Sequence, residues 1–166
     1  SPTPYDAALL YDKNITFKKT YAGKRRLYRS IFNVLDIFKT GWGIVMSLFS
    51  VFSLYPDVVF GKGGYASFPV LCAARILRIP VVIHESDTVP GRVNAWAAKF
   101  ATKIAVSYPE AAEKFPAERV AVTGNPLRKE LMSPLHDGAH EYLKLSSNVP
   151  TVFVVGGSQG AQLLND

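Results

Sequence analysis

The chain has 166 residues, of which 48% are hydrophobic and 19% are charged, and its formal net charge is +6. These values exclude a disordered chain, and the length allows one complete hydrophobic core with the beginning of another. The single cysteine, Cys72, excludes an internal disulfide, is typical of a reducing compartment and is expected to be a buried structural thiol. The chain opens on Ser1 without an initiator Met and stops at Asp166, just inside an expected helix, so we interpret it as a fragment of a longer protein.

The first third of the chain is predicted to hold a strand, a basic turn and a long apolar helix. Residues 15–21 alternate enough to form a strand, and residues 22–26 read as a basic turn. Residues 27–54 are mostly aliphatic and aromatic and predict a helix. Its uncharged part, residues 40–56, includes glycines and serines and is shorter than the roughly 20 residues of a spanning helix, so we expect it to be buried in protein.

The remaining sequence alternates strands and helices, which predicts an α/β fold with a parallel sheet. The expected strands are residues 57–60, 80–84, 102–107, 119–123 and 151–155, and the expected helices are residues 67–78 and 92–100. Polar residues and prolines loosen the pattern after position 124. We therefore expect a Rossmann-like domain over residues 1–124, a linker over residues 125–149, and the start of a second such domain over residues 150–166.

A strand, a glycine turn and a helix occur in this order twice, in residues 57–65 and in residues 151–160. Glycine allows positive φ and close approach of a ligand, and the helix that follows offers N–H groups and the positive end of its dipole. Such turns suit phosphate. Two of them, about ninety residues apart, indicate two Rossmann-like halves with a nucleotide or diphosphate in the crevice between them.

The first glycine turn also fits a dinucleotide-binding module. Gly61, Gly63 and Ala66 match the pattern G-x-G-x-x-A, and Glu85 follows at a strand end, where a ribose-binding acid belongs. A non-catalytic module of this kind stays open as an alternative.

The second glycine turn fits a serine hydrolase. Gly156, Ser158 and Gly160 match the nucleophile elbow G-x-S-x-G between a strand and a helix. That fold places its acid and its histidine after the serine, and the eight residues after Ser158 contain no histidine. A hydrolase therefore needs residues from a continuation of the chain.

Basic residues gather near the N-terminus, where residues 13–39 hold eight of the nineteen lysines and arginines and one acid. Apolar residues interleave with them, so this segment can press apolar groups into a lipid interface while its cations meet anionic headgroups. Nucleic acid is not expected as a partner because no tandem basic helices or aromatic platforms accompany the cluster. An ordinary solvated basic turn stays open. The candidate membrane-surface residues are Arg25, Arg26, Leu27, Arg29, Ile31 and Phe32.

Several segments in one order resemble the MurG family of glycosyltransferases. They are Gly-Lys-Gly-Gly-Tyr-Ala-Ser at 61–67, Ile-Pro-Val-Val-Ile-His-Glu-Ser-Asp at 79–87, Val-Pro-Gly-Arg-Val-Asn-Ala-Trp-Ala-Ala-Lys at 89–99, Gly-Asn-Pro-Leu-Arg at 124–128 and Val-Val-Gly-Gly-Ser-Gln-Gly-Ala at 154–161. Each glycine motif alone is weak evidence of family, whereas the ordered set is specific.

This resemblance implies a two-domain GT-B fold and an inverting, metal-independent transfer without a tightly bound cofactor. The donor would be UDP-N-acetylglucosamine, and the acceptor would be the C4 hydroxyl of the muramyl sugar of lipid I, an undecaprenyl-diphosphate lipid. The product would be lipid II for peptidoglycan synthesis, and hence for cell-wall growth, cell shape and division. The resemblance also implies a peripheral protein at the cytoplasmic face of the bacterial cell membrane.

The resemblance further implies roles for residues of the two glycine turns and for Arg128, which lies between the turns in the sequence. Gly63, Gly64 and Tyr65 would meet the acceptor diphosphate, with the helix at Ser67 adding its dipole. Arg128 would approach the diphosphate of UDP. The residues expected to hold the donor phosphate are Ser158, Gln159 and Gly160. A plain turn, a core tyrosine and an exposed linker arginine stay open as structural alternatives.

The segment His84, Glu85, Ser86, Asp87 ends a strand, where sites of parallel sheets are found. His84, Glu85 and Asp87 are candidate substrate-binding residues by the resemblance, although the family usually has Asn where this chain has Asp87. His84 alone, on an apolar strand, is more typical of a hydrogen-bonded structural histidine. In the segment that follows, Asn94 and Trp96 are expected to pack or cap.

No catalytic base is expected inside this chain. The family's histidine-bearing glycine loop should precede Ser1, and most donor contacts should follow Asp166. We therefore expect the isolated chain to have no transferase activity. His136 and His140 have helical i, i+4 spacing, but no third metal ligand is evident and no metal site is expected.

Overall fold

The computed structural model describes residues 7–23, 32–132, 138–146, 148–152 and 154. The chain divides into two compact units, residues 1–125 and residues 126–166. The sheet and its helices belong to the first unit.

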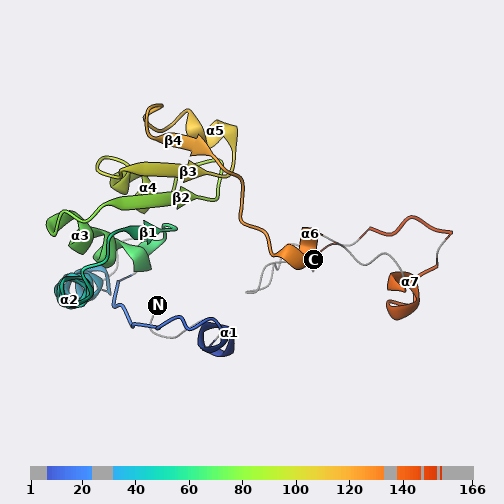
Figure 1. The fold of residues 1–166 in the computed structure, drawn as a ribbon, viewed down its shortest axis with the longest axis horizontal. Coiled ribbons are helices and arrows are strands. Elements are labelled where there is room, and N and C mark those ends of the chain that lie inside the picture. The colour runs from blue at the N-terminus through green and yellow to red at the C-terminus, as the bar shows by residue number, and fades with distance from the viewer. Residues whose placement is uncertain (1–6, 24–31, 133–137, 147, 153, 155–166) are drawn as a thin grey trace. The chain divides into compact units, whose positions relative to one another are not determined.

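Four parallel strands form the sheet in the order β1, β2, β3, β4 (Figure 1). Val59 pairs with Val81, Ile83 with Ile104, and Val106 with Val122. The sheet is more buried on one face than on the other. Val59, Val81, Ile83, Ile104 and Val106 are buried, whereas Phe60 is exposed and Val82 and Ala105 are partly exposed. The predicted α/β parallel sheet is confirmed, with strands at Val59–Gly61, Val81–Glu85, Lys103–Val106 and Val120–Val122.

The helices between these strands are shorter than predicted. A 3-10 turn, η1 (Tyr65–Ser67), leads into α3 (Phe68–Ile76), and α4 is Arg92–Ala97. A further helix, α5 (Pro109–Ala112), was not predicted, because four residues are too few for a periodic signal. Proline at its first position has the φ that a helix start needs.

The core of the first unit lies between the sheet and these helices. Small side chains on the helices let them approach the strands closely, while branched side chains fill the strands. The fully buried members are Leu71, Ala73, Ala74, Val81, Ile83, Ala97, Ala101, Ile104, Val106 and Ala111.

The segment before α2 is not the predicted strand. After α1 (Ala7–Asp12), residues 13–23 have no regular secondary structure, so the strand predicted at 15–21 is wrong. The segment is fixed by α2 instead of by a neighbouring strand. A Cβ at Gly43 would overlap the carbonyl oxygen of Tyr21, and the Gly23 N–H donates to Thr40 Oγ1 at 3.0 Å. Sequence alternation alone does not show whether a partner strand exists.

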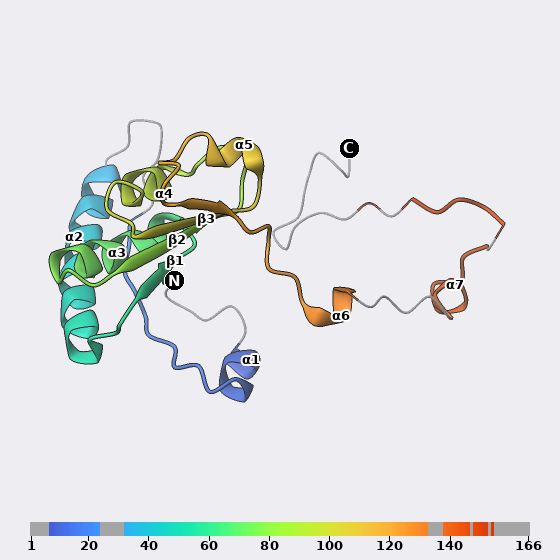
Figure 2. The same ribbon diagram turned by 45° about the horizontal axis from the view of Figure 1, so that its top comes forward.

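The long apolar helix is α2 (Phe32–Leu54), which packs against α3 (Figure 2). Gly43, Ser47 and Val51 are buried at i, i+4 spacing, which places one narrow stripe against the protein. Most of α2 is exposed, contrary to the expectation of a buried helix. Only 17% of the apolar stretch within residues 35–54 is buried. With a mean hydropathy of 1.5 over 20 residues, this stretch is long and apolar enough to cross a membrane by length and composition.

The second unit has two short helices, α6 (Lys129–Met132) and α7 (Ala139–Tyr142), within the segment predicted to be a linker. At the predicted strand 151–155, the described residues 151, 152 and 154 have no regular structure. A strand forms only when a neighbour completes its hydrogen bonds, and none pairs with these residues in the described part of the chain. The assignment of this unit to a linker and a second Rossmann-like domain stays a prediction.

Candidate functional site

The candidate site lies along the carboxyl edge of the sheet. Because all four strands are parallel, their carboxyl ends lie at one edge, where open α/β sheets bind ligands. The glycine turn follows β1, the loop 86–91 follows β2, Ser107 follows β3, and Gly124 follows β4.

The glycine turn after β1 has a backbone that only glycine adopts readily. Gly63 has φ +80°, and Gly64 has φ +76° with ψ +156°. The Ser67 hydroxyl lies 2.9 Å from the carbonyl oxygen of Gly63 and 2.8 Å from that of Gly64, and it can donate to either one. Tyr65, which is 51% exposed, is not the core residue of the structural alternative.

Glu85 organises the loop after β2. Its side chain is only 4% exposed, and each of its carboxylate oxygens accepts a backbone N–H group. Asp87 N–H donates to Oε1 at 3.1 Å, and Gly91 N–H donates to Oε2 at 2.8 Å. The side-chain amide of Asn94 adds a third bond, from Nδ2 to Oε2 at 3.0 Å. The loop 86–91 therefore wraps around a buried carboxylate.

His84 connects β2 to the segment after β4. Its Nε2 donates to the carbonyl oxygen of Gly124 at 3.1 Å, which requires the proton to be on Nε2. Ser107 Oγ lies 3.5 Å from the same nitrogen and donates to Asn125 Oδ1 at 2.8 Å. The expectation of a hydrogen-bonded histidine is met. His84 Nδ1 is buried and has no hydrogen-bond partner among the described residues.

The structure does not test the binding roles of the other predicted residues. The Asp87 side chain is exposed, and Arg128 is exposed next to α6 in the second unit. Ser158, Gln159 and Gly160 lie outside the described residues, as do the candidate membrane residues from Arg25 to Ile31. Phe32 begins α2. The binding roles of all these residues stay predictions.

The structure adds residues that the sequence reading did not select. Ser107 ends one predicted strand, and Gly124 follows the next. They could have been selected from the sequence, because sites of parallel sheets lie at the carboxyl ends of the strands. Asn94, expected to pack or cap, is 1% exposed and hydrogen-bonded to Glu85. Trp96 packs as expected, with ring centroids 4.8 Å from those of Phe68 and Phe100.

Neither alternative function gains support. A dinucleotide-binding module needs a free acid at Glu85, whose two oxygens already accept three N–H groups inside the protein. The proposed nucleophile Ser158 lies outside the described residues. Within the described ranges, no group of three His, Cys, Asp or Glu side chains is placed to hold a metal ion.

The sequence is similar to curated N-acetylglucosamine transferases of bacteria. The model of the glycosyltransferase family 28 N-terminal domain matches residues 4–106. A Treponema denticola protein is 45% identical over 148 residues, which is 87% of this chain and 38% of the relative. A Lachnospira eligens protein is 37% identical over 166 residues, which is 100% of this chain and 47% of the relative. Both are named UDP-N-acetylglucosamine--N-acetylmuramyl-(pentapeptide) pyrophosphoryl-undecaprenol N-acetylglucosamine transferase. The chain thus spans less than half the length of these curated relatives.

Solved structures agree with this similarity. Acinetobacter baumannii MurG superposes with a TM-score of 0.59 at 32% identity, covering 81% of this chain and 37% of that one. S. aureus MnaA, solved with UDP, superposes with a TM-score of 0.51 at 18% identity, covering 86% of this chain and 37% of that one, and shows the fold alone. The resemblance to the MurG family and the GT-B type of fold are confirmed. With the family model matching more than half of the sequence, the chain belongs to glycosyltransferase family 28.

Proposed function

We propose that this chain is the acceptor-side part of an inverting transferase that makes lipid II in peptidoglycan synthesis. The observation that carries the proposal is its 37–45% identity, over most of its length, to transferases of that name. In this reaction the C4 hydroxyl of the muramyl sugar of lipid I attacks the anomeric carbon of UDP-N-acetylglucosamine and expels UDP. The proposed reaction needs no metal and no tightly bound cofactor.

The geometry of the glycine turn supports a diphosphate site. The carbonyl oxygens of Gly63 and Gly64 point to the Ser67 hydroxyl. In a planar trans peptide the N–H points opposite to the carbonyl, so the N–H groups of Gly64 and Tyr65 face away from Ser67. The partially negative carbonyl oxygens of the turn thus face Ser67, and the N–H groups face away from it. N–H groups presented in this way are the arrangement that anions prefer. Apart from Gly64 itself and its two chain neighbours, no atom of the described residues lies within 4 Å of a Cβ built on Gly64, so the backbone there is open to a ligand.

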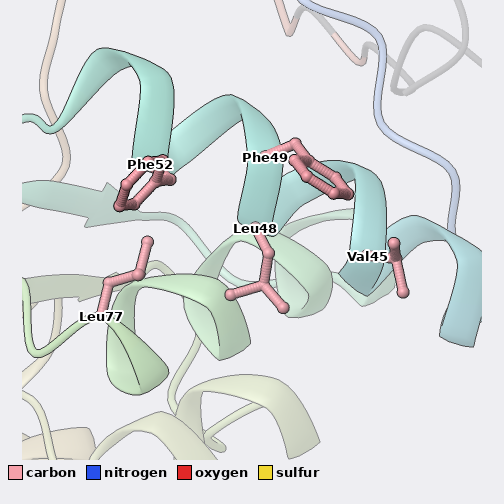
Figure 3. Close-up of a pocket in the computed structure, with 5 residues that line it drawn as sticks. All are labelled: Val45, Leu48, Phe49, Phe52 and Leu77. Carbon is pink, nitrogen blue, oxygen red and sulfur yellow. The ribbon is translucent and has the colours of Figure 1, made fainter.

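The exposed face of α2 supports a membrane-bound acceptor. Phe49 is 70% exposed and Phe52 is 66% exposed. Neighbouring large apolar side chains that are exposed to this extent are typical of an interaction surface. Together with Val45, Leu48 and Leu77 they line an open, wholly apolar groove of about 390 Å³ between α2 and the end of α3 (Figure 3). Because Gly43, Ser47 and Val51 hold α2 against the protein, we propose that α2 lies along the surface of the bilayer and does not cross it. The family resemblance implies that this surface is the cytoplasmic one.

A chimaera tests the proposed function. Residues 1–166 of this chain would replace the aligned segment of the Lachnospira eligens relative, which matches all 166 residues. The purified chimaera is expected to transfer labelled N-acetylglucosamine from its UDP carrier to a lipid I analogue. The matched control carries Gly64→Val, which adds a side chain on the open part of the turn, and should be folded and inactive. A folded chimaera without transfer, beside an active parent enzyme, would contradict the proposal. The chain on its own is expected to transfer nothing.

A further inference from the structure

Asn94 is held in one orientation by two acceptors. It lies in the first turn of α4, and its Nδ2 donates to the His84 carbonyl oxygen at 3.0 Å and to Glu85 Oε2 at 3.0 Å. A carbonyl oxygen and a carboxylate oxygen only accept hydrogen bonds, so the amide nitrogen of Asn94, and not its oxygen, must face them. At 1% exposure the side chain cannot reach a ligand in solvent.

The same amide lies directly beneath the glycine turn. A Cβ built on Gly63 would lie 2.8 Å from Asn94 Nδ2 and 3.1 Å from Asn94 Oδ1. These separations are below normal contact, so no side chain fits at Gly63 while Asn94 stays in place. Asn94 Oδ1 is buried and has no hydrogen-bond partner among the described residues, so the bonds of Nδ2 alone fix the orientation of the amide.

We propose that Asn94 is a positioning residue for the glycine turn, because it supports Gly63 from below while it fixes Glu85 and the loop 86–91. This inference rests on the proposed function, in which the turn meets the acceptor diphosphate. The contact with Asn94 fixes the position of the turn backbone relative to the carboxyl edge of the sheet. It therefore also fixes the positions at which the N–H groups of Gly64 and Tyr65 meet the phosphate oxygens. It couples the loops after β1 and β2 into one unit.

A double-mutant cycle on the chain itself tests the contact independently of activity. Gly63→Ala is expected to lower the denaturation midpoint, and about half or more of this shift should disappear in the Asn94→Ala background, where the methyl group has room. Gly64→Ala is the matched control, because Gly64 also has positive φ but no atom within 4 Å of a Cβ. The shift caused by Gly64→Ala should be the same with and without Asn94.

Asn94→Leu separates support from hydrogen bonding. Leucine keeps the bulk under Gly63 but cannot donate to Glu85, so it should not relieve Gly63→Ala. Asn94→Ser is the second variant if Asn94→Ala does not fold. Equal shifts in all backgrounds would overturn the proposal. Failure of both Asn94→Ala and Asn94→Ser to fold would also overturn it, since Asn94 would then serve the fold as a whole.

Kinetics of the chimaera distinguish positioning from a general loss of folded enzyme. Asn94→Ala is expected to raise KM for the lipid I analogue on the order of tenfold and to leave KM for UDP-N-acetylglucosamine unchanged. Arg92→Ala, an exposed position in the same helix, should change neither constant. A fall in kcat with both KM values unchanged would contradict the proposal. If the unsubstituted chimaera transfers nothing, the proposed function fails, while the denaturation cycle still decides the role of Asn94.

Discussion

The carboxyl edge of the sheet and the outer face of α2 depart from the usual distribution of side chains in opposite directions. At the edge, His84, Glu85 and Asn94 are polar and buried, whereas along α2 Phe49 and Phe52 are apolar and exposed. A buried polar group or a large exposed apolar patch is more informative than the reverse, because each costs stability unless something compensates. At the edge the compensation is mostly internal, through hydrogen bonds to the protein, and among the described residues only His84 Nδ1 and Asn94 Oδ1 of these side chains stay without a partner. At α2 we expect it to come from lipid outside the protein.

The largest expected effect comes from removing the carboxylate at the edge. Glu85→Ala leaves the N–H groups of Asp87 and Gly91 and the amide of Asn94 without their acceptor. The buried N–H group of Asn94 costs about 1–3 kcal/mol when it is left without an acceptor, and the part-buried N–H groups of Asp87 and Gly91 cost less each, so we expect a loss of about 3 kcal/mol in the free energy of unfolding. Chemical denaturation measures it. Glu113→Ala, at an exposed position, should shift stability by less than about 0.5 kcal/mol. Similar small losses in both variants would mean that the edge is not stabilised internally.

The face of α2 offers the opposite test, because its compensation is expected to be external. The double variant Phe49→Ser and Phe52→Ser should weaken binding of the chain to anionic vesicles by about tenfold or more. Full burial of one phenylalanine contributes about 1.5–3 kcal/mol, and the lipid interface buries each side chain only in part. Its stability in solution should be unchanged or higher. Vesicle co-sedimentation measures the binding. Tyr142→Ser is the control, because Tyr142 is an even more exposed aromatic residue but lies in the second unit. Unchanged binding would leave the apolar face without a lipid role.

Salt separates the apolar face from the basic segment before it. Charge reversal at Arg25 and Arg26 should reduce vesicle binding at low salt, and the difference should shrink as added salt screens the charges. The apolar contribution of α2 should persist at high salt. No effect of charge reversal at any salt concentration would favour an ordinary solvated basic turn.

A smaller effect is expected within the glycine turn. Ser67→Ala removes the hydroxyl that holds the carbonyl groups of Gly63 and Gly64. One such hydrogen bond contributes about 1 kcal/mol, so KM of the chimaera for the lipid I analogue should rise about fivefold, with KM for the donor unchanged. Ser86→Ala, in the loop after β2, is the control. An unchanged acceptor KM would show that Ser67 does not orient the turn.

The sequence predicted the sheet and the glycine turn because their signals are local. An apolar run followed by glycine specifies a buried strand and a turn within a few residues, as in Val59–Gly61 and Gly63. The contacts of Glu85 were not predictable in this way, because its partners at Asp87, Gly91 and Asn94 meet only when the loop folds back. The exposure of α2 was also missed. Composition shows that a helix is apolar and does not show what covers it.

Cys72 gives the smallest expected effect and lies between the two regions, on α3. Burial raises the pKa of the half-buried Cys72 thiol above its ordinary value, and the charge of Arg75 lowers this pKa in part. The folded chain therefore holds the thiol proton more tightly than the unfolded chain. This contribution to stability is complete below the ordinary thiol pKa and is lost as the pH rises through the raised value. At neutral pH, iodoacetamide should alkylate Cys72 several-fold more slowly in the native chain than in the urea-unfolded chain. Equal rates would mean that α3 opens readily, and the support that α3 gives to α2 and to the glycine turn would then be weaker than the packing indicates.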